Sequence, residues 1–122
     1  DGIRDVAVTG VQTCALPIFS IAGRRGFPLA GVPYTAAKFA QGAIGMFANF
    51  EAHADGVRVT NIHPGEVETP ILEKRPVKPT AEQRAKMLQP EDVAEMAVAV
   101  AKLPPRAVVP ELVITPLYQP QT

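Results

Sequence analysis

A tyrosine and a lysine four residues apart are the side chains in this sequence best suited to acid–base chemistry. They are the first and last residues of Tyr34-Thr35-Ala36-Ala37-Lys38. In a helix, side chains at positions i and i+4 lie on one face, one turn apart. A phenol titrates near pH 10, so a tyrosine exchanges protons at neutral pH only beside positive charge. Lys38 would supply that charge, although the same spacing also occurs at surface ion-pair positions and around tyrosines that reach toward water.

Two further segments give this pair a context. Upstream lies Ile18-Phe19-Ser20-Ile21-Ala22-Gly23, and downstream Val57-Arg58-Val59-Thr60-Asn61-Ile62 runs into Pro64-Gly65-Glu66-Val67-Glu68-Thr69. In this order and at this approximate spacing, the three segments resemble the short-chain dehydrogenase/reductases. The resemblance extends from about Phe19 to the end of the chain.

The resemblance implies a fold and an activity. The fold expected is α/β, the C-terminal portion of a Rossmann-like doubly wound parallel sheet with about three strands and without the N-terminal half. The activity expected is hydride transfer between NAD or NADP and an alcohol or carbonyl substrate, a small molecule. In the family the helix that carries the tyrosine also packs against a second subunit. A homo-oligomer through residues 34–54 is therefore expected for the parent protein.

The resemblance also assigns roles to individual residues. Tyr34 would exchange the proton with the substrate oxygen, and Ser20 would hydrogen-bond the same oxygen. Lys38 would hydrogen-bond the nicotinamide ribose and stabilise the phenolate. The catalytic set expected is therefore Ser20, Tyr34 and Lys38. The cofactor-binding set expected is Tyr34, Lys38, Pro64, Gly65, Val67 and Thr69.

The alternation of patterns along the chain predicts strand, helix, strand, helix, strand. The strands are expected to end near Ser20 and to cover residues 57–62 and 108–115, all parallel. Between them we expect a loop over residues 23–33, a largely buried helix over 34–54, a short helix from Thr80 to about Leu88, and a helix from Pro90. His63, alone in its loop with no evident carboxylate partner, is expected to be structural, and no metal site is expected.

The first eighteen residues need a separate explanation. Residues 8–18 resemble the translation of a common sequencing adapter fused in frame, which would make residues 1–18 an artefact and residues 19–122 the dehydrogenase part. That origin implies metagenomic or draft-genome material and removes Cys14, the only cysteine, from redox arguments. Pro17 also removes a ladder donor where a buried strand is expected.

Composition narrows the class of protein further. The 122 residues are 47% hydrophobic and carry no formal net charge, values typical of one globular domain and not of a nucleic-acid-binding protein. No apolar run is long enough for a membrane span, and the start lacks the features of a signal peptide. A cytoplasmic location is the simplest interpretation.

Three hypotheses about function follow. The chain is a fragment of an oxidoreductase, a truncated translation without a function of its own, or a stand-alone helical interaction module. The first two are compatible, because the glycine-rich turn that binds the dinucleotide pyrophosphate is absent from this sequence. The truncated chain itself is therefore expected to be inactive.

Overall fold

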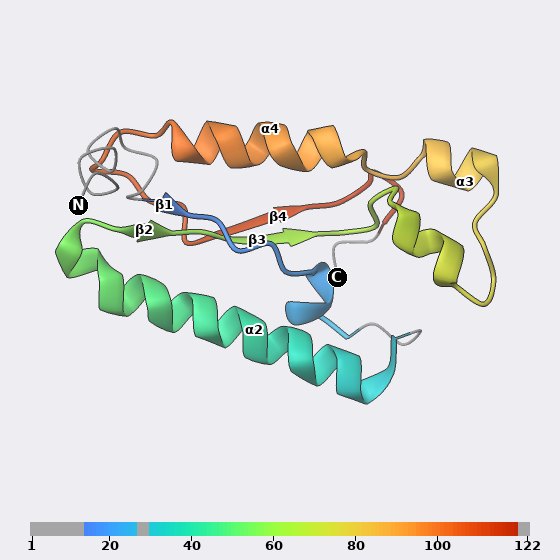
Figure 1. Cartoon of the computed structure of the whole chain (residues 1–122), viewed down its shortest axis with the longest axis horizontal. Coiled ribbons are helices and arrows are strands. Elements are labelled where there is room, and N and C mark those ends of the chain that lie inside the picture. The colour runs from blue at the N-terminus through green and yellow to red at the C-terminus, as the bar shows by residue number, and fades with distance from the viewer. Residues whose placement is uncertain (1–13, 27–29, 120–122) are drawn as a thin grey trace.

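A layer of short strands lies between two long helices. The computed structural model describes residues 14–26 and 30–119. Helix α2 runs along one side of the strands and α4 along the other, with α3 beyond the end of α4 (Figure 1). The strands are β1 (Cys14–Ala15), β2 (Arg58–Val59), β3 (Asn61–Pro64) and β4 (Glu111–Ile114). The helices are α2 (Gly31–Ala52), α3 (Ala81–Ala85) and α4 (Pro90–Ala101), with 3₁₀ turns η2 (Ile21–Gly23), η4 (His53–Asp55) and η5 (Pro70–Lys74).

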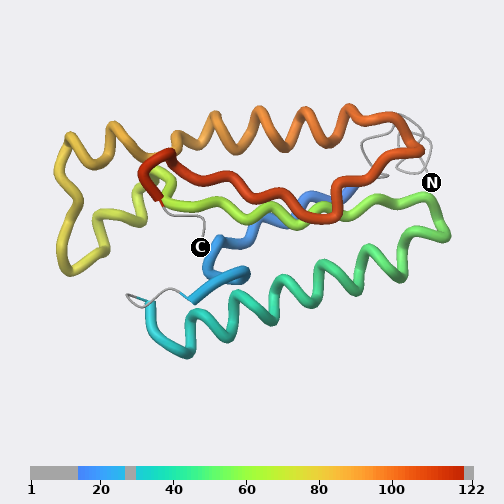
Figure 2. The backbone as a smooth tube through the Cα atoms, turned by 180° about the vertical axis from the view of Figure 1, so that it is seen from behind, coloured from blue at the N-terminus to red at the C-terminus, as the bar shows by residue number. Residues whose placement is uncertain are grey.

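The strands pair in parallel, as the sequence predicted. β1 pairs with β2 and β3 pairs with β4, and a parallel bridge joins Ile18 to Ile62. The strand expected over residues 57–62 divides at Thr60, whose N–H donates to Ala15 at 2.9 Å, whereas the next N–H donates to Pro110 at 3.0 Å. Successive N–H groups of a central strand point to opposite neighbours, so this segment is the middle of three. Figure 2 shows it from behind, between the N-terminal and C-terminal segments.

The N-terminal strand takes part in this layer despite its proline. Pro17 has no N–H, but its carbonyl accepts from Ile62 at 3.0 Å, and Phe19 donates to Ile62 at 2.7 Å. Leu16 packs against the core cluster of Ile62, Leu88 and Val93. The adapter origin of residues 1–18 stays a prediction, and residues 1–13 of that segment lie outside the described residues.

Helix α2 approaches the strands closely because it carries small residues there. A side chain at Gly45 would overlap the amide of Asn61, and one at Gly42 would touch His63. The Asn61 amide donates to the Gly42 carbonyl at 3.0 Å, and Asn49 accepts from Val59 at 3.1 Å. These contacts fix the position of the helix along the strands.

The ends of α2 are close to the predicted ones. The helix begins at Gly31, three residues earlier than expected. Its first turn can include Pro33, because an N–H in the first turn has no intrahelical acceptor and its absence costs no bond. It ends at Ala52, after which η4 leads to Gly56. The φ of 72° at Gly56 explains the glycine, since that conformation strains other residues. Of the loop expected over residues 23–33, Gly23 belongs to η2 and residues 31–33 belong to α2, and residues 27–29 lie outside the described residues.

The expectation that α2 is largely buried is wrong. Of its described residues only Gly42 and Gly45 are buried, whereas Ile44, Phe47 and Phe50 are 68%, 66% and 71% exposed. The strands and η2 make most of the contacts to the helix, on one side of it. A periodic pattern reports that a face is apolar, but not whether this chain supplies its cover.

The C-terminal helices begin where their capping residues predict. Thr80 accepts from the Gln83 N–H at 3.2 Å while the Gln83 side chain accepts from Thr80 at 2.8 Å. α3 ends at Ala85, earlier than the predicted Leu88. α4 begins at Pro90 and buries Val93 and Val100. Among the described residues, no helix is long and apolar enough to cross a membrane.

Gly45→Ala is predicted to destabilise the fold strongly, because the added methyl group overlaps Asn61 where helix and strand touch. We expect a loss of at least about 2 kcal/mol in the free energy of unfolding, measured by urea denaturation. Gly26→Ala is the matched control, because nothing lies within 4 Å of a methyl group added there. Equal stability of the two variants would contradict the close contact.

Candidate active site

One cavity of about 220 Å³ brings together residues from four separate segments of the chain. It lies where β3 ends, beyond the carboxyl edge of the parallel strands, the edge where open α/β sheets bind ligands. The predicted site residues that line it are Ser20, Tyr34, Pro64, Gly65, Val67 and Thr69. Of the predicted set, only Lys38 is not in the lining.

Tyr34 and Lys38 lie together as their spacing predicted. The Lys38 ammonium nitrogen is 5.5 Å from the centre of the Tyr34 ring. It also donates to the side chain of Gln41 at 2.9 Å. The lysine therefore approaches the tyrosine from the helix surface, beside the cavity. A ligand that extends from the cavity along α2 would meet its ammonium group.

Ser20 is positioned by a buried histidine. The Ser20 hydroxyl oxygen accepts from the Ala22 N–H at 3.1 Å, which leaves its proton free to donate. The Ser20 carbonyl accepts from Nδ1 of His63 at 3.0 Å, and His63 is fully buried. The structural role expected for His63 fits these contacts. The expectation that no carboxylate lies nearby is wrong, because Nε2 is 3.8 Å from Glu111, which the fold brings in from β4.

The turn after β3 presents uncommitted backbone groups. Glu68 donates to Leu88 at 2.8 Å and Leu88 donates to Glu66 at 3.1 Å, so both neighbours of Val67 bond to Leu88, which lies between α3 and α4. Residue orientation alternates along an extended segment, which turns the N–H and carbonyl of Val67 to the opposite side. Neither these groups nor the Thr69 hydroxyl has a partner among the described residues. A donor and an acceptor so placed fit the carboxamide of a nicotinamide.

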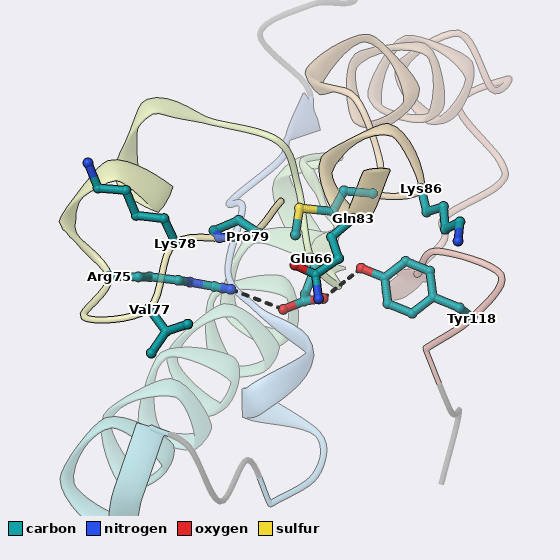
Figure 3. Close-up of a pocket in the computed structure, with 9 residues that line it drawn as sticks. Glu66, Arg75, Val77, Lys78, Pro79, Gln83, Lys86 and Tyr118 are labelled. Atoms are coloured by element: carbon teal, nitrogen blue, oxygen red, sulfur yellow. Dashed lines mark hydrogen bonds and ion pairs between the residues drawn. The ribbon is translucent and has the colours of Figure 1, made fainter. Parts of the chain in front are cut away.

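A network that sequence reasoning missed surrounds Glu66. Arg75 donates to one carboxylate oxygen at 3.2 Å, and the Tyr118 hydroxyl donates to the other at 2.6 Å (Figure 3). Burial, with the hydrogen bond and the charge of Glu66, raises the pKa of Tyr118 to about 12. The phenol thus stays protonated and donating throughout the physiological range.

The C-terminal segment accepts hydrogen bonds from the same turn. The Gly65 N–H donates to Ile114 at 2.8 Å, and the Glu66 N–H donates to the side chain of Gln119 at 3.1 Å. A side chain at Gly65 would collide with Gln119 and Pro116, so only glycine permits this approach. The one sequence signal for the contacts around Glu66 is that this acidic residue stands at the variable position of the Pro-Gly-x-Val-x-Thr pattern.

A second and larger cavity adjoins the first. Its volume is about 510 Å³, and it shares Glu66 and Arg75 with the first cavity. In Figure 3 the Arg75 side chain points to Glu66 at the centre of the lining, opposite Tyr118. The remaining lining residues are Val77, Lys78, Pro79, Gln83, Lys86 and Met87. The Glu66–Arg75 pair is thus a wall common to both cavities.

This sequence is similar to known dehydrogenases and reductases. A sequence profile described as short chain dehydrogenase matches residues 12–79, more than half of the chain. Glycine betaine reductase ATRR of Emericella nidulans is 34% identical over 108 residues, which are 84% of this chain and 8% of that protein. Sepiapterin reductase of Chlorobaculum tepidum is 32% identical over 99 residues, 81% of this chain and 38% of that protein.

Solved structures show the same fold. Serine dehydrogenase from Escherichia coli superposes with a TM-score of 0.69 at 27% identity, over 96% of this chain and 47% of that one. An alcohol dehydrogenase from Thermococcus sibiricus, complexed with 5-hydroxy-NADP, superposes with a TM-score of 0.72 at 29% identity. The superposition covers 89% of this chain and 44% of that one. The chain therefore spans less than half the length of each of these four relatives. A closed form of serine dehydrogenase, with a TM-score of 0.72 at 27% identity, is complexed with NADP+, so nicotinamide dinucleotides are bound in both kinds of structural relative.

The Tyr118–Glu66 bond predicts an unusual phenol titration. The chain has two tyrosines and no tryptophan, so in the Tyr34→Phe variant the ultraviolet absorbance of the phenolate reports Tyr118 alone. We expect a pKa of about 12, and Glu66→Gln should move it toward 10. Because the folded pKa exceeds the unfolded one, Tyr118 contributes stability below pH 10 that is lost as the pH rises to about 12.

Glu68→Gln is the control for this titration, because Glu68 pairs with Arg84 instead. It should leave the pKa of Tyr118 unchanged. A titration of Tyr118 near pH 10 in the chain that retains Glu66 would contradict the network.

Proposed function

The chain belongs to the short chain dehydrogenase family, and on that premise we propose that it is the proton-transfer part of a longer oxidoreductase. The complete protein would transfer hydride between NAD or NADP and an alcohol or carbonyl substrate, with Tyr34 as general acid and base. The observation that carries this proposal is the single cavity shared by Ser20, Tyr34, Val67 and Thr69.

Each residue would have a distinct task. The dinucleotide, when bound, supplies or accepts the hydride. The Tyr34 hydroxyl would give a proton to the substrate oxygen or take one from it, and the Ser20 hydroxyl would hold that oxygen in place. Lys38, 5.5 Å from the Tyr34 ring centre, would stabilise the phenolate and reach the ribose.

The turn after β3 would hold the nicotinamide end of the cofactor. Pro64, Gly65, Val67 and Thr69 line the cavity, and neither the backbone N–H and carbonyl of Val67 nor the Thr69 hydroxyl has a partner among the described residues. His63 would keep the Ser20 segment beside this turn through its 3.0 Å hydrogen bond. Hydrogen-bond donors held this rigidly need no rearrangement during the reaction.

The remaining contacts to the dinucleotide would come from a preceding half. The relatives are more than twice as long as the matched part of this chain, and this sequence has no glycine-rich turn between a strand and a helix. The 122-residue chain by itself would therefore be inactive. A truncated translation without function describes the same molecule, whereas a helical interaction module is disfavoured by the family match.

The exposed apolar face of α2 suits a subunit interface in the complete protein. Ile44, Met46, Phe47 and Phe50 are each more than half exposed. Large exposed apolar patches mark interaction sites, and a homo-oligomer through residues 34–54 would cover this one.

Tyr34→Phe is predicted to lower the turnover of the complete protein at least about 100-fold, since it removes the general acid and base. Dinucleotide binding, measured by calorimetry, should persist. Thr35→Val is the matched control, because Thr35 neighbours Tyr34 on the helix but does not line the cavity. Turnover of the phenylalanine variant at the rate of the control would refute the role of Tyr34.

The 122-residue chain alone is predicted not to bind NAD or NADP measurably. The groups present reach only the nicotinamide end, whereas much of the affinity of a dinucleotide comes from its pyrophosphate and adenosine. Calorimetric titration with both dinucleotides tests this. Saturable binding tighter than about 100 µM, roughly −5.5 kcal/mol, would show that the described residues form a sufficient site.

A further inference from the structure

We propose that Arg75 and Gln119 bind a carboxylate of the substrate, so that the reaction proposed above acts on small hydroxy acids and the corresponding oxo acids. This inference rests on the proposed function and adds the class of its substrate. Both residues line the cavity that contains Ser20 and Tyr34, and both offer donors that the fold leaves unused.

Arg75 is held in place but not saturated. Its Nη1 donates to Glu66 at 3.2 Å, a single contact on one oxygen. No described residue accepts from its Nε or Nη2, and about a third of its side chain remains exposed. A guanidinium carries five N–H donors in a rigid plane, which matches the two oxygens of a carboxylate. Glu66, itself held by Tyr118, orients that plane in advance (Figure 3).

Gln119 supplies a second donor beside it. The residue is 7% exposed, and its Oε1 accepts from the Glu66 N–H at 3.1 Å. Because a backbone N–H can only donate, this bond identifies the oxygen of the amide and leaves Nε2 as the other end. Nε2 has no acceptor among the described residues. It is not one of the fully buried polar atoms that lack a partner, so it remains accessible to an acceptor from a ligand in the cavity that Gln119 lines.

The size and position of the cavity favour a small acid. A volume of about 220 Å³ must hold both the substrate and the nicotinamide end of the cofactor. Ser20 and Tyr34 would take the reacting oxygen, and Arg75 and Gln119 would take the carboxylate across the same cavity. Apolar side chains, among them Phe19 and Leu72, line the remaining surface. In a compact 3-hydroxy acid, the alcohol and the carboxylate are close enough for both to lie within one cavity of this size.

The test compares an acid with its neutral ester. The complete protein is assayed with 3-hydroxybutyrate and methyl 3-hydroxybutyrate, and the acid-to-ester ratio of kcat/KM is measured. We expect the acid to be preferred at least tenfold. Arg75→Gln should abolish that preference, and Arg75→Lys should reduce it because a lysine lacks the planar fork.

Gln119→Glu is the sharper variant, since it keeps the oxygen that accepts from Glu66 and replaces the donating amide with a negative charge. It should lower the ratio more than tenfold. Lys78→Gln removes a positive charge from the adjoining cavity only and should leave the ratio unchanged. An unchanged ratio in both Arg75→Gln and Gln119→Glu would overturn the proposal.

Binding provides a readout that does not need turnover. In the Tyr34→Phe background, calorimetry with 3-hydroxybutyrate should show saturable binding that Arg75→Gln weakens at least tenfold. Such binding, found together with no alcohol oxidation by the protein that retains Tyr34, would refute the proposed function and still support the carboxylate site. Oxidation of the ester without measurable binding of the acid would support the proposed function and refute the carboxylate site. Equal affinity for inorganic phosphate would overturn the assignment of the site to a carboxylate.

Discussion

The close contact between α2 and β3 is the constraint on which the site depends. Gly42 and Gly45 let the helix backbone approach the strand, and Asn61 donates to the Gly42 carbonyl across the contact. This contact sets where Tyr34, near the start of the helix, stands relative to the end of the strand. His63, two residues beyond Asn61, then holds the Ser20 carbonyl, so one strand positions both sides of the cavity.

The second constraint is the pair of hydrogen bonds that joins the turn after β3 to the C-terminal segment. Parallel pairing of β3 and β4 ends both strands at the same edge, which brings Ile114 and Gln119 onto Gly65 and Glu66. Glu66 then joins the C-terminal segment to Arg75, which follows the 3₁₀ turn η5. The turn that would hold a nicotinamide and the wall that would meet a substrate are therefore parts of one network.

The exposed face of α2 and the narrow core have a common cause. A parallel sheet is normally covered on both faces and extended on both sides, whereas the described residues form only two strand pairs between α2 and α4. Few residues can then be fully buried, and the apolar side chains of α2 face outward. The chain spans less than half of the serine dehydrogenase and the alcohol dehydrogenase named above, which is consistent with that cover lying outside this sequence.

Local chemistry in the sequence determined the elements and the central pair. The i,i+4 spacing placed Lys38 beside Tyr34, and capping by Thr80 began α3, because both depend on residues within one turn. The tertiary structure alone decided that Glu66 meets Tyr118, since those residues are 52 positions apart and no local pattern links them. It also decided that α2 is exposed, because burial depends on which other segments are present to cover a face.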